Sequence, residues 1–141
     1  MKDRVFVDTN IYIYFLLEDK ENPDKTQKAQ NIIKKLYDKE IIISVQVLNE
    51  IYNTLLKYKI SDDLIRKKLD LIISKTVLTD TNLYTLEKCW EIKSKYNYSY
   101  WDSLIIASAI QADCFRLYTE DMQHRQIIDM KVGIENPFLE D

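Results

Sequence analysis

Short apolar runs alternate along the chain with longer segments in which apolar residues recur at helical spacing. The first run, Arg4 to Val7, has the β-branched and aromatic residues of a buried strand. The run at Glu40 to Ile43 is continuous, which is typical of a parallel strand covered on both faces. Further strands are predicted at 76–78 and 115–118, and one last short strand from the segments 127–128 and 132–134.

The segments between these strands predict helices. Ile11 to Leu17 is apolar throughout, as in a buried helix, and a polar loop follows at 19–24. Asp24 and Gln27 have the spacing of a capping box. Three serines stand where N-caps belong, directly before apolar stripes of helical period: Ser44, Ser61 and Ser99. Helices are therefore predicted at 11–17, from 24 to about 36, after 44, after 61, at about 81–96 and at 100–112.

The alternation of strands and helices predicts an α/β fold. Right-handed crossovers between such strands build a parallel central sheet. In sheets of this kind ligands bind beyond the carboxyl ends of the strands. Functional residues are therefore expected just after a strand or in the first turns of the helix that follows it.

Composition fits a single soluble domain at 1–141, with 46% hydrophobic and 30% charged residues and only one Gly and two Pro for linkers. The start of the chain lacks the apolar segment of a signal peptide. The apolar run Ile11 to Leu17 is shorter than the roughly 20 residues that cross a bilayer. Two cysteines without metal-like spacing are typical of thiols in a reducing compartment. We therefore expect a cytoplasmic protein that has no contact with a membrane.

The net charge of −3 and the pI of about 5.3 argue against a protein that holds nucleic acid on a broad basic surface. They do not exclude a nuclease. Carboxylates that hold metal ions lower the pI and leave phosphate binding to the metal.

Four acids stand at the positions where this fold places functional groups. Asp8 follows the first strand, Asp121 follows the fourth, Glu50 lies beside the apolar stripe of the helix after the second, and Asp102 lies in the first turn of a largely apolar helix. Each has a structural alternative. Asp8 can form an Asx turn or an N-cap, Asp102 a capping box with Ser99, and Glu50 and Asp121 are explained singly by a solvated helix face and by loop chemistry.

Together, four carboxylates at one edge of a sheet predict a cation site. Carboxylates about 5 Å apart repel by roughly 3 kcal/mol per pair at an effective dielectric near 20, and a divalent cation reverses that sign. Oxygen-only ligands favour Mg²⁺ or Mn²⁺ over zinc, since His124 and two distant cysteines cannot build a His/Cys site. Asn10 and Thr119 are candidates to orient ligands or waters, with hydrogen bonding to turn backbone as the alternative, and Thr9 is expected to be purely structural.

Four short motifs, taken in order and spacing, resemble the PIN-domain ribonucleases, in particular the toxins of VapBC-type toxin–antitoxin pairs. The motifs are Val7-Asp8-Thr9-Asn10, Val47-Leu48-Asn49-Glu50-Ile51, the segment Tyr100 to Ala109, and the segment Leu117 to His124. The close at 133–138 is also similar, whereas Arg125 stands where a Gly often follows the last motif.

The resemblance implies a three-layer α/β/α sandwich and a core acidic triad of Asp8, Glu50 and Asp102, with Asp121 as a fourth, more variable acid. It also implies Mg²⁺ or Mn²⁺ dependence, cleavage of RNA, frequent homodimers, and inhibition by a cognate antitoxin. We therefore expect a metal-dependent endoribonuclease. The alternative is a catalytically inactive module of this fold that acts by binding protein or RNA.

Two further features have open interpretations. The aromatic turn at 96–101 is a candidate for stacking on RNA bases, with packing or a dimer surface as the alternative. The basic stretch at 57–68 either guides the phosphate backbone or is a solvated helix face. A phosphatase of the haloacid-dehalogenase type is disfavoured, because its second acid would stand at Asn10.

Overall fold

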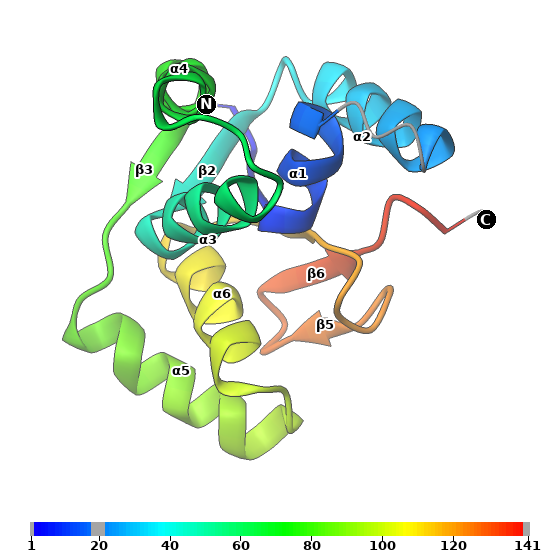
Figure 1. The fold of residues 1–141 in the computed structure, drawn as a ribbon. Helices are drawn as coiled ribbons and strands as arrows, with labels where there is room; N and C mark the ends of the chain where they lie inside the picture. The colour runs from blue at the N-terminus through cyan, green and yellow to red at the C-terminus, as the bar shows by residue number, and fades with distance from the viewer. Residues whose placement is uncertain (1, 18–21, 140–141) are drawn as a thin grey trace.

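The computed structural model describes residues 2–17 and 22–139, so residues 19–21 of the predicted loop at 19–24 lie outside the described residues (Figure 1). The strands are β1 (Arg4–Val7), β2 (Glu40–Ser44), β3 (Val77–Thr79), β4 (Arg116–Tyr118), β5 (Ile127–Ile128) and β6 (Val132–Glu135). The helices are α1 (Thr9–Leu17), α2 (Pro23–Lys35), α3 (Val45–Lys57), α4 (Asp62–Lys75), α5 (Leu83–Tyr96) and α6 (Tyr100–Gln111).

The strands form one sheet in the order β3-β2-β1-β4-β6-β5. All pairs are parallel except β5 with β6, which confirms the predicted α/β class. The prediction of one last short strand was wrong, because the chain reverses between β5 and β6. Asp129 and Met130 both have positive φ, 51° and 56°, and Lys131 N donates to the Ile128 carbonyl at 2.9 Å. Positive φ at both central residues is the requirement of a type I′ hairpin turn.

Helices cover both faces of the sheet. Right-handed crossovers connect β1 to β2 through α1 and α2, and β2 to β3 through α3 and α4. The crossover from β3 back to β4 runs in the opposite direction along the sheet through α5 and α6. Helices α1 to α4 therefore lie on one face of the sheet, and α5 and α6 lie on the other. Figure 1 shows α1 to α4 in its upper half and α5 and α6 in its lower half. The result is the expected three-layer sandwich. None of the helices within 2–17 and 22–139 has the length and apolar character needed to span a bilayer.

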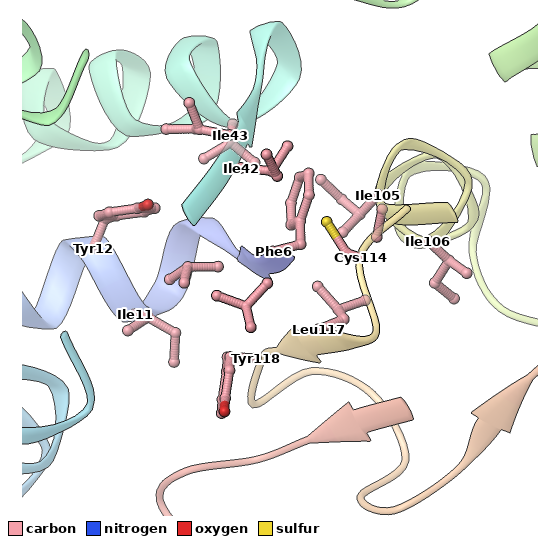
Figure 2. Close-up of a cluster of buried hydrophobic side chains, with 14 of the residues drawn as sticks. Phe6, Ile11, Tyr12, Ile42, Ile43, Ile105, Ile106, Cys114, Leu117 and Tyr118 are labelled. Carbon is pink, nitrogen blue, oxygen red and sulfur yellow. The ribbon is translucent and has the colours of Figure 1, made fainter. Parts of the chain in front are cut away.

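The core is centred on β1, which lies between β2 and β4. Phe6 is fully buried and pairs in register with Ile42 on β2 and Leu117 on β4. Figure 2 shows these side chains in one cluster with Ile105 of α6 and Cys114. Burial of β1 on both faces fixes the position at which this strand ends, and therefore the position of Asp8.

Helix starts follow the predicted caps in three cases. Ser44 and Ser61 each accept a hydrogen bond from the backbone N–H three residues on, and Ser99 does the same for α6. The predicted capping box of Asp24 and Gln27 was wrong. The N-cap of α2 is Asn22 and Pro23 takes the first helical position, where its fixed φ is favourable, so Asp24 already lies inside the first turn.

Candidate active site

The carboxyl ends of β1, β2 and β4 lie side by side, because the three strands are adjacent and parallel. Helices α1 and α3 begin directly after β1 and β2, so their first turns lie at this edge of the sheet. Helix α6 runs back across the sheet before β4, which brings its N-terminus to the same edge. Each of the four predicted acids is on one of these segments.

Asp8 is buried at the junction of β1 and α1, with 4% of its surface exposed. Its Oδ1 accepts from the backbone N–H of Thr9 at 2.7 Å, and its Oδ2 accepts from the Thr119 hydroxyl at 2.8 Å. An N-cap side chain instead accepts from the second or third residue of the helix. Helix capping therefore does not explain why an acid stands at this position.

The Asp8 carboxyl holds its proton unusually tightly. Burial raises its pKa from the ordinary 3.8 to about 7, against the opposing effect of the hydrogen bonds from Thr9 and Thr119. The negative charges of Glu50 and Asp121 also contribute to the rise, and the value of about 7 includes all of these effects. A cation bound beside Asp8 would relieve both the burial and the repulsion, so this carboxyl is well suited to a positively charged ligand.

Glu50 is half-buried and held from two sides. The Thr9 hydroxyl donates to Oε2 at 3.2 Å, and the Gln46 amide donates to Oε1 at 2.8 Å. The same Gln46 nitrogen donates to the Trp101 carbonyl at 3.2 Å, which links α3 to the first turn of α6. Glu50 therefore points toward the Asp8 junction and is not a freely solvated helix residue.

Asp121 is exposed but its position is fixed through Asn10 and Thr119. Asn10 Nδ2 donates to Asp121 Oδ2 at 2.9 Å and lies 3.3 Å from the Thr119 hydroxyl, and Asp121 N donates to that hydroxyl at 3.2 Å. Asn10 Oδ1 also accepts from the Glu120 N–H at 3.4 Å. Asn10 therefore contacts the Asp121 carboxylate and Thr119 the Asp8 carboxylate, and both also contact turn backbone. Their predicted part in orienting ligands stays a prediction.

The loop that carries Asp121 is anchored by its neighbour Glu120. Lys25 of α2 donates to Glu120 Oε2 at 2.8 Å, and the Tyr14 hydroxyl donates to Oε1 at 3.0 Å. The Lys25 ammonium also lies 5.5 Å from the centre of the Phe138 ring. Contacts from α1, α2 and the C-terminal segment thus hold the loop after β4 in one place.

Asp102 is half-buried in the first turn of α6, where its backbone N–H donates to Ser99 Oγ at 3.2 Å. Desolvation raises the pKa of its carboxyl, a hydrogen bond with Ser99 lowers it, and the charge of Asp121 raises it. Within the described residues Asp102 forms no hydrogen bond with Asp8, Glu50 or Asp121. Its connection to the other acids is therefore electrostatic, through Asp121.

The available ligand atoms are of the type that a hard cation binds, but they do not surround a complete coordination site. In the part of the chain that the structure describes, no three acidic, histidine or cysteine side chains are grouped so as to hold a metal ion. All the acidic donors are carboxylate oxygens, and Gln46 Oε1 beside Glu50 is buried with no hydrogen-bond partner among the described residues. Mg²⁺ usually keeps several waters and takes only one or two carboxylates. The residues therefore fit Mg²⁺ or Mn²⁺, and the ligand role of the four acids stays a prediction.

The structure adds two residues that the sequence analysis did not assign to the site. Gln46 stands four positions before Glu50 on one helix, a spacing that brings side chains together and is visible in the sequence. Thr9 was expected to be purely structural, yet its hydroxyl contacts Glu50. That contact depends on the pairing of β1 with β2, for which the sequence has no local signal.

Comparison with known proteins gives the following matches. Residues 5–129 match the PIN domain family, and no curated protein matches the sequence. The chain is similar to a toxin–antitoxin complex from Klebsiella pneumoniae, with a TM-score of 0.71 and 18% identity over 94% of this chain and 97% of that chain. It is similar to DNA-bound VapBC from Salmonella typhimurium, with a TM-score of 0.70 and 15% identity over 96% and 98%. It is also similar to VapC20 of Mycobacterium tuberculosis, described as a sarcin-ricin loop cleaving toxin, with a TM-score of 0.66 and 16% identity over 83% and 91%.

Proposed function

The chain belongs to the PIN domain family, and from this premise we propose that it is a metal-dependent endoribonuclease, the toxin of a type II toxin–antitoxin pair. One observation carries the proposal. Asp8 is buried at the carboxyl edge of the sheet with a pKa raised to about 7, and hydroxyl and amide side chains link it to Glu50 and Asp121. Structural neighbours that are toxins or toxin–antitoxin complexes, one of them described as a sarcin-ricin loop cleaving toxin, support it.

In this proposal one or two hydrated metal ions take their carboxylate ligands from among four acids: Asp8, Glu50, Asp102 and Asp121. A bound Mg²⁺ or Mn²⁺ supplies the activation of water and the neutralisation of phosphate charge that hydrolysis of a phosphodiester requires. The chain's own contribution is position. The Thr119 hydroxyl orients the Asp8 carboxylate, and Thr9 and Gln46 hold both oxygens of Glu50.

The Asn10 side chain connects the start of α1 to the loop after β4, which carries Asp121. Its amide nitrogen orients Asp121 and its amide oxygen accepts from the backbone of the loop after β4. The side chain therefore fixes the distance between the loop and the start of α1. This fixed frame lowers the cost of bringing substrate and cation into one geometry.

Further expectations belong to the same proposal. The partners are an RNA substrate, a cognate antitoxin and a second copy of the chain in a homodimer, and the site of action is the cytoplasm. Residues 1–141 act as one nuclease domain. Similarity to toxin–antitoxin complexes of nearly the same chain length supports the antitoxin.

An inactive binding module of the same fold is the second candidate. The unfavourable burial of Asp8 beside two other acids argues against it, because a module without a cation would gain stability from an uncharged residue here. The test is incubation of the purified protein with a cellular RNA pool, with and without Mg²⁺ or Mn²⁺, and mapping of new RNA ends.

The matched variants are Asp102→Asn and Asp38→Asn, the second on an exposed turn before β2 at the other edge of the sheet. We expect metal-dependent cuts from the native protein and from Asp38→Asn, and none from a folded Asp102→Asn. Cuts from a folded Asp102→Asn would remove that residue from the site. Absence of any metal-dependent cut by the native protein would favour the inactive module.

A further inference from the structure

A groove of about 760 Å³ opens beside the acids. Its walls are the N-terminal half of α3, the loop from β3 to α5, and the first turns of α6, with Val45, Leu104 and the Trp101 indole as apolar surface. Its volume lies within the roughly 300–1,000 Å³ of typical ligand pockets. Gln46 lines the groove and also donates to Glu50, so the groove begins where the acidic site ends.

The aromatic turn at 96–101 divides into residues that are engaged and one that is available. The Tyr96 hydroxyl is bonded to Asp129, and the Tyr98 hydroxyl donates to Gln126 and accepts from the Gln123 N–H. Tyr100 is packed edge-on against Trp101, with ring centroids 5.2 Å apart. Trp101 itself is 64% exposed and lines the groove, so much of its indole surface remains accessible beside the contact with Tyr100.

The polar rim of the groove is suited to an uncharged partner that donates hydrogen bonds. No Lys or Arg is found among the described residues that line it, so nothing there attracts a phosphate group. Asp80 brings a carboxylate to the rim and Asn49 an amide, and within 2–17 and 22–139 neither side chain is used in a hydrogen bond. An aromatic face with an acceptor at its edge matches an unstacked nucleobase, which proteins bind by stacking and by its Watson–Crick edge.

We propose that this groove is a subsite for one unpaired base of the RNA substrate, next to the bond that is cut, and that it selects guanine. The inference rests on the proposed function, because the occupant is the substrate of the acidic site. Trp101 stacks on the base. The Asp80 carboxylate accepts from the adjacent N1–H and N2–H groups of guanine, whereas uracil presents a single N–H between two carbonyl oxygens that the carboxylate repels. Phosphates bind outside the groove.

The test measures binding independently of cleavage. Trp90 and Trp101 are the two tryptophans of the chain, so Trp90→Phe leaves Trp101 as the sole indole. In an Asp8→Asn, Trp90→Phe background with Mg²⁺, oligouridine hexamers with and without one central guanine are titrated while Trp101 fluorescence is recorded. We expect quenching, with the guanine hexamer bound at least fivefold more tightly. Asp80→Asn removes that preference.

Cleavage by the otherwise native protein supplies the second readout. Trp101→Ala is expected to raise KM for the guanine hexamer about five- to hundredfold, the range for loss of a stacking aromatic, with kcat little changed. Trp101→Phe restores most of the loss. Tyr37→Ala, at an exposed aromatic residue at the opposite edge of the sheet, leaves both constants unchanged.

Three results decide between the possibilities. Quenching with guanine preference in the fluorescence variant, together with a native protein that cuts no RNA, supports base binding in the groove and refutes the nuclease. Cleavage that is indifferent to Trp101→Ala and to Asp80→Asn refutes the subsite and leaves the nuclease. Lack of quenching by every hexamer also overturns the proposal, and assigns the groove to a protein partner or to no ligand.

Discussion

Replacing Asp8 with asparagine should change how the stability of the metal-free protein depends on pH. The raised pKa means that folded Asp8 keeps a proton that the unfolded chain has already lost. The contribution of Asp8 to native stability is therefore greatest below pH 4 and falls as the pH rises to about 7. A rise from 3.8 to about 7 corresponds to about 4 kcal/mol at 1.36 kcal/mol per pKa unit. About 2–3 kcal/mol of this falls between pH 5 and pH 8. The asparagine side chain of the variant does not titrate, so the variant lacks this loss of stability.

The assay is urea unfolding of both proteins in EDTA from pH 5 to pH 8. The Asp8→Asn variant has one acceptor oxygen in place of the two that the Thr9 N–H and the Thr119 hydroxyl use, and the loss of one acceptor costs it about 1–3 kcal/mol at every pH. The informative quantity is therefore the change in the difference between the two proteins across the pH range. We expect the native protein to lose about 2–3 kcal/mol relative to the variant on going from pH 5 to pH 8. If the difference in unfolding free energy between the two proteins stays constant within about 1 kcal/mol, the raised pKa of buried Asp8 is refuted.

Three other changes test separate parts of the structure. Glu50→Gln should abolish cleavage. It should also lower the pKa of Asp8 by removing a nearby negative charge, so that the metal-free protein loses stability at lower pH in the same urea series. A loss of stability at the same pH as in the native protein would contradict the electrostatic effect of Glu50 on Asp8. Asn10→Ala should lower kcat at least tenfold while the circular dichroism spectrum stays native, because Asp121 loses its amide partner; full activity would remove Asn10 from the site. Asp129→Ala should destabilise the fold by about 2 kcal/mol without changing kcat, since Asp129 accepts from Lys95, Lys88 and Tyr96. The hydrogen bond from Lys95 lowers the pKa of Asp129, so this stabilisation is present at neutral pH and is lost on acidification, and a melting temperature equal to that of the native protein would contradict it.

The strands and most helix starts could be predicted because their signals are local. An apolar β-branched run such as β2 identifies a buried strand, and a serine before a helical stripe identifies a cap, as at Ser44. Arg125 adopts φ 69°, a conformation in which Gly is unstrained, and this accounts for the Gly that similar chains have at that position.

Predictions of local structure failed where two local signals competed and where a turn had only a weak signal in the sequence. Asp24 and Gln27 had the spacing of a capping box, but Pro23 is better suited to the first helical position. Helix α2 therefore begins earlier in the sequence than predicted, with Asn22 as its N-cap. The hairpin of β5 and β6 was missed because its turn uses Asp129 and Met130 in place of the usual Gly or Asn. Neither residue is a strong sequence signal for positive φ.

The acids of the site could be proposed from their positions after strands, whereas the contacts that hold them could not. Contacts from Thr9 to Glu50 and from Asn10 to Asp121 join residues 41 and 111 positions apart. They exist only because β1 lies between β2 and β4, and this order follows from global packing. The high pKa of Asp8 could not be predicted from its position either, because it comes mainly from burial of the carboxyl in the folded protein.

Anomalous diffraction from crystals soaked in Mn²⁺ tests the central claim most directly. The account predicts an anomalous peak at the carboxyl edge of the sheet, within coordination distance of Asp8 and of at least one of Glu50, Asp102 and Asp121, and loss of that peak in Asp8→Asn crystals. A well-ordered, Mn²⁺-saturated crystal with no peak beside Asp8 would contradict it.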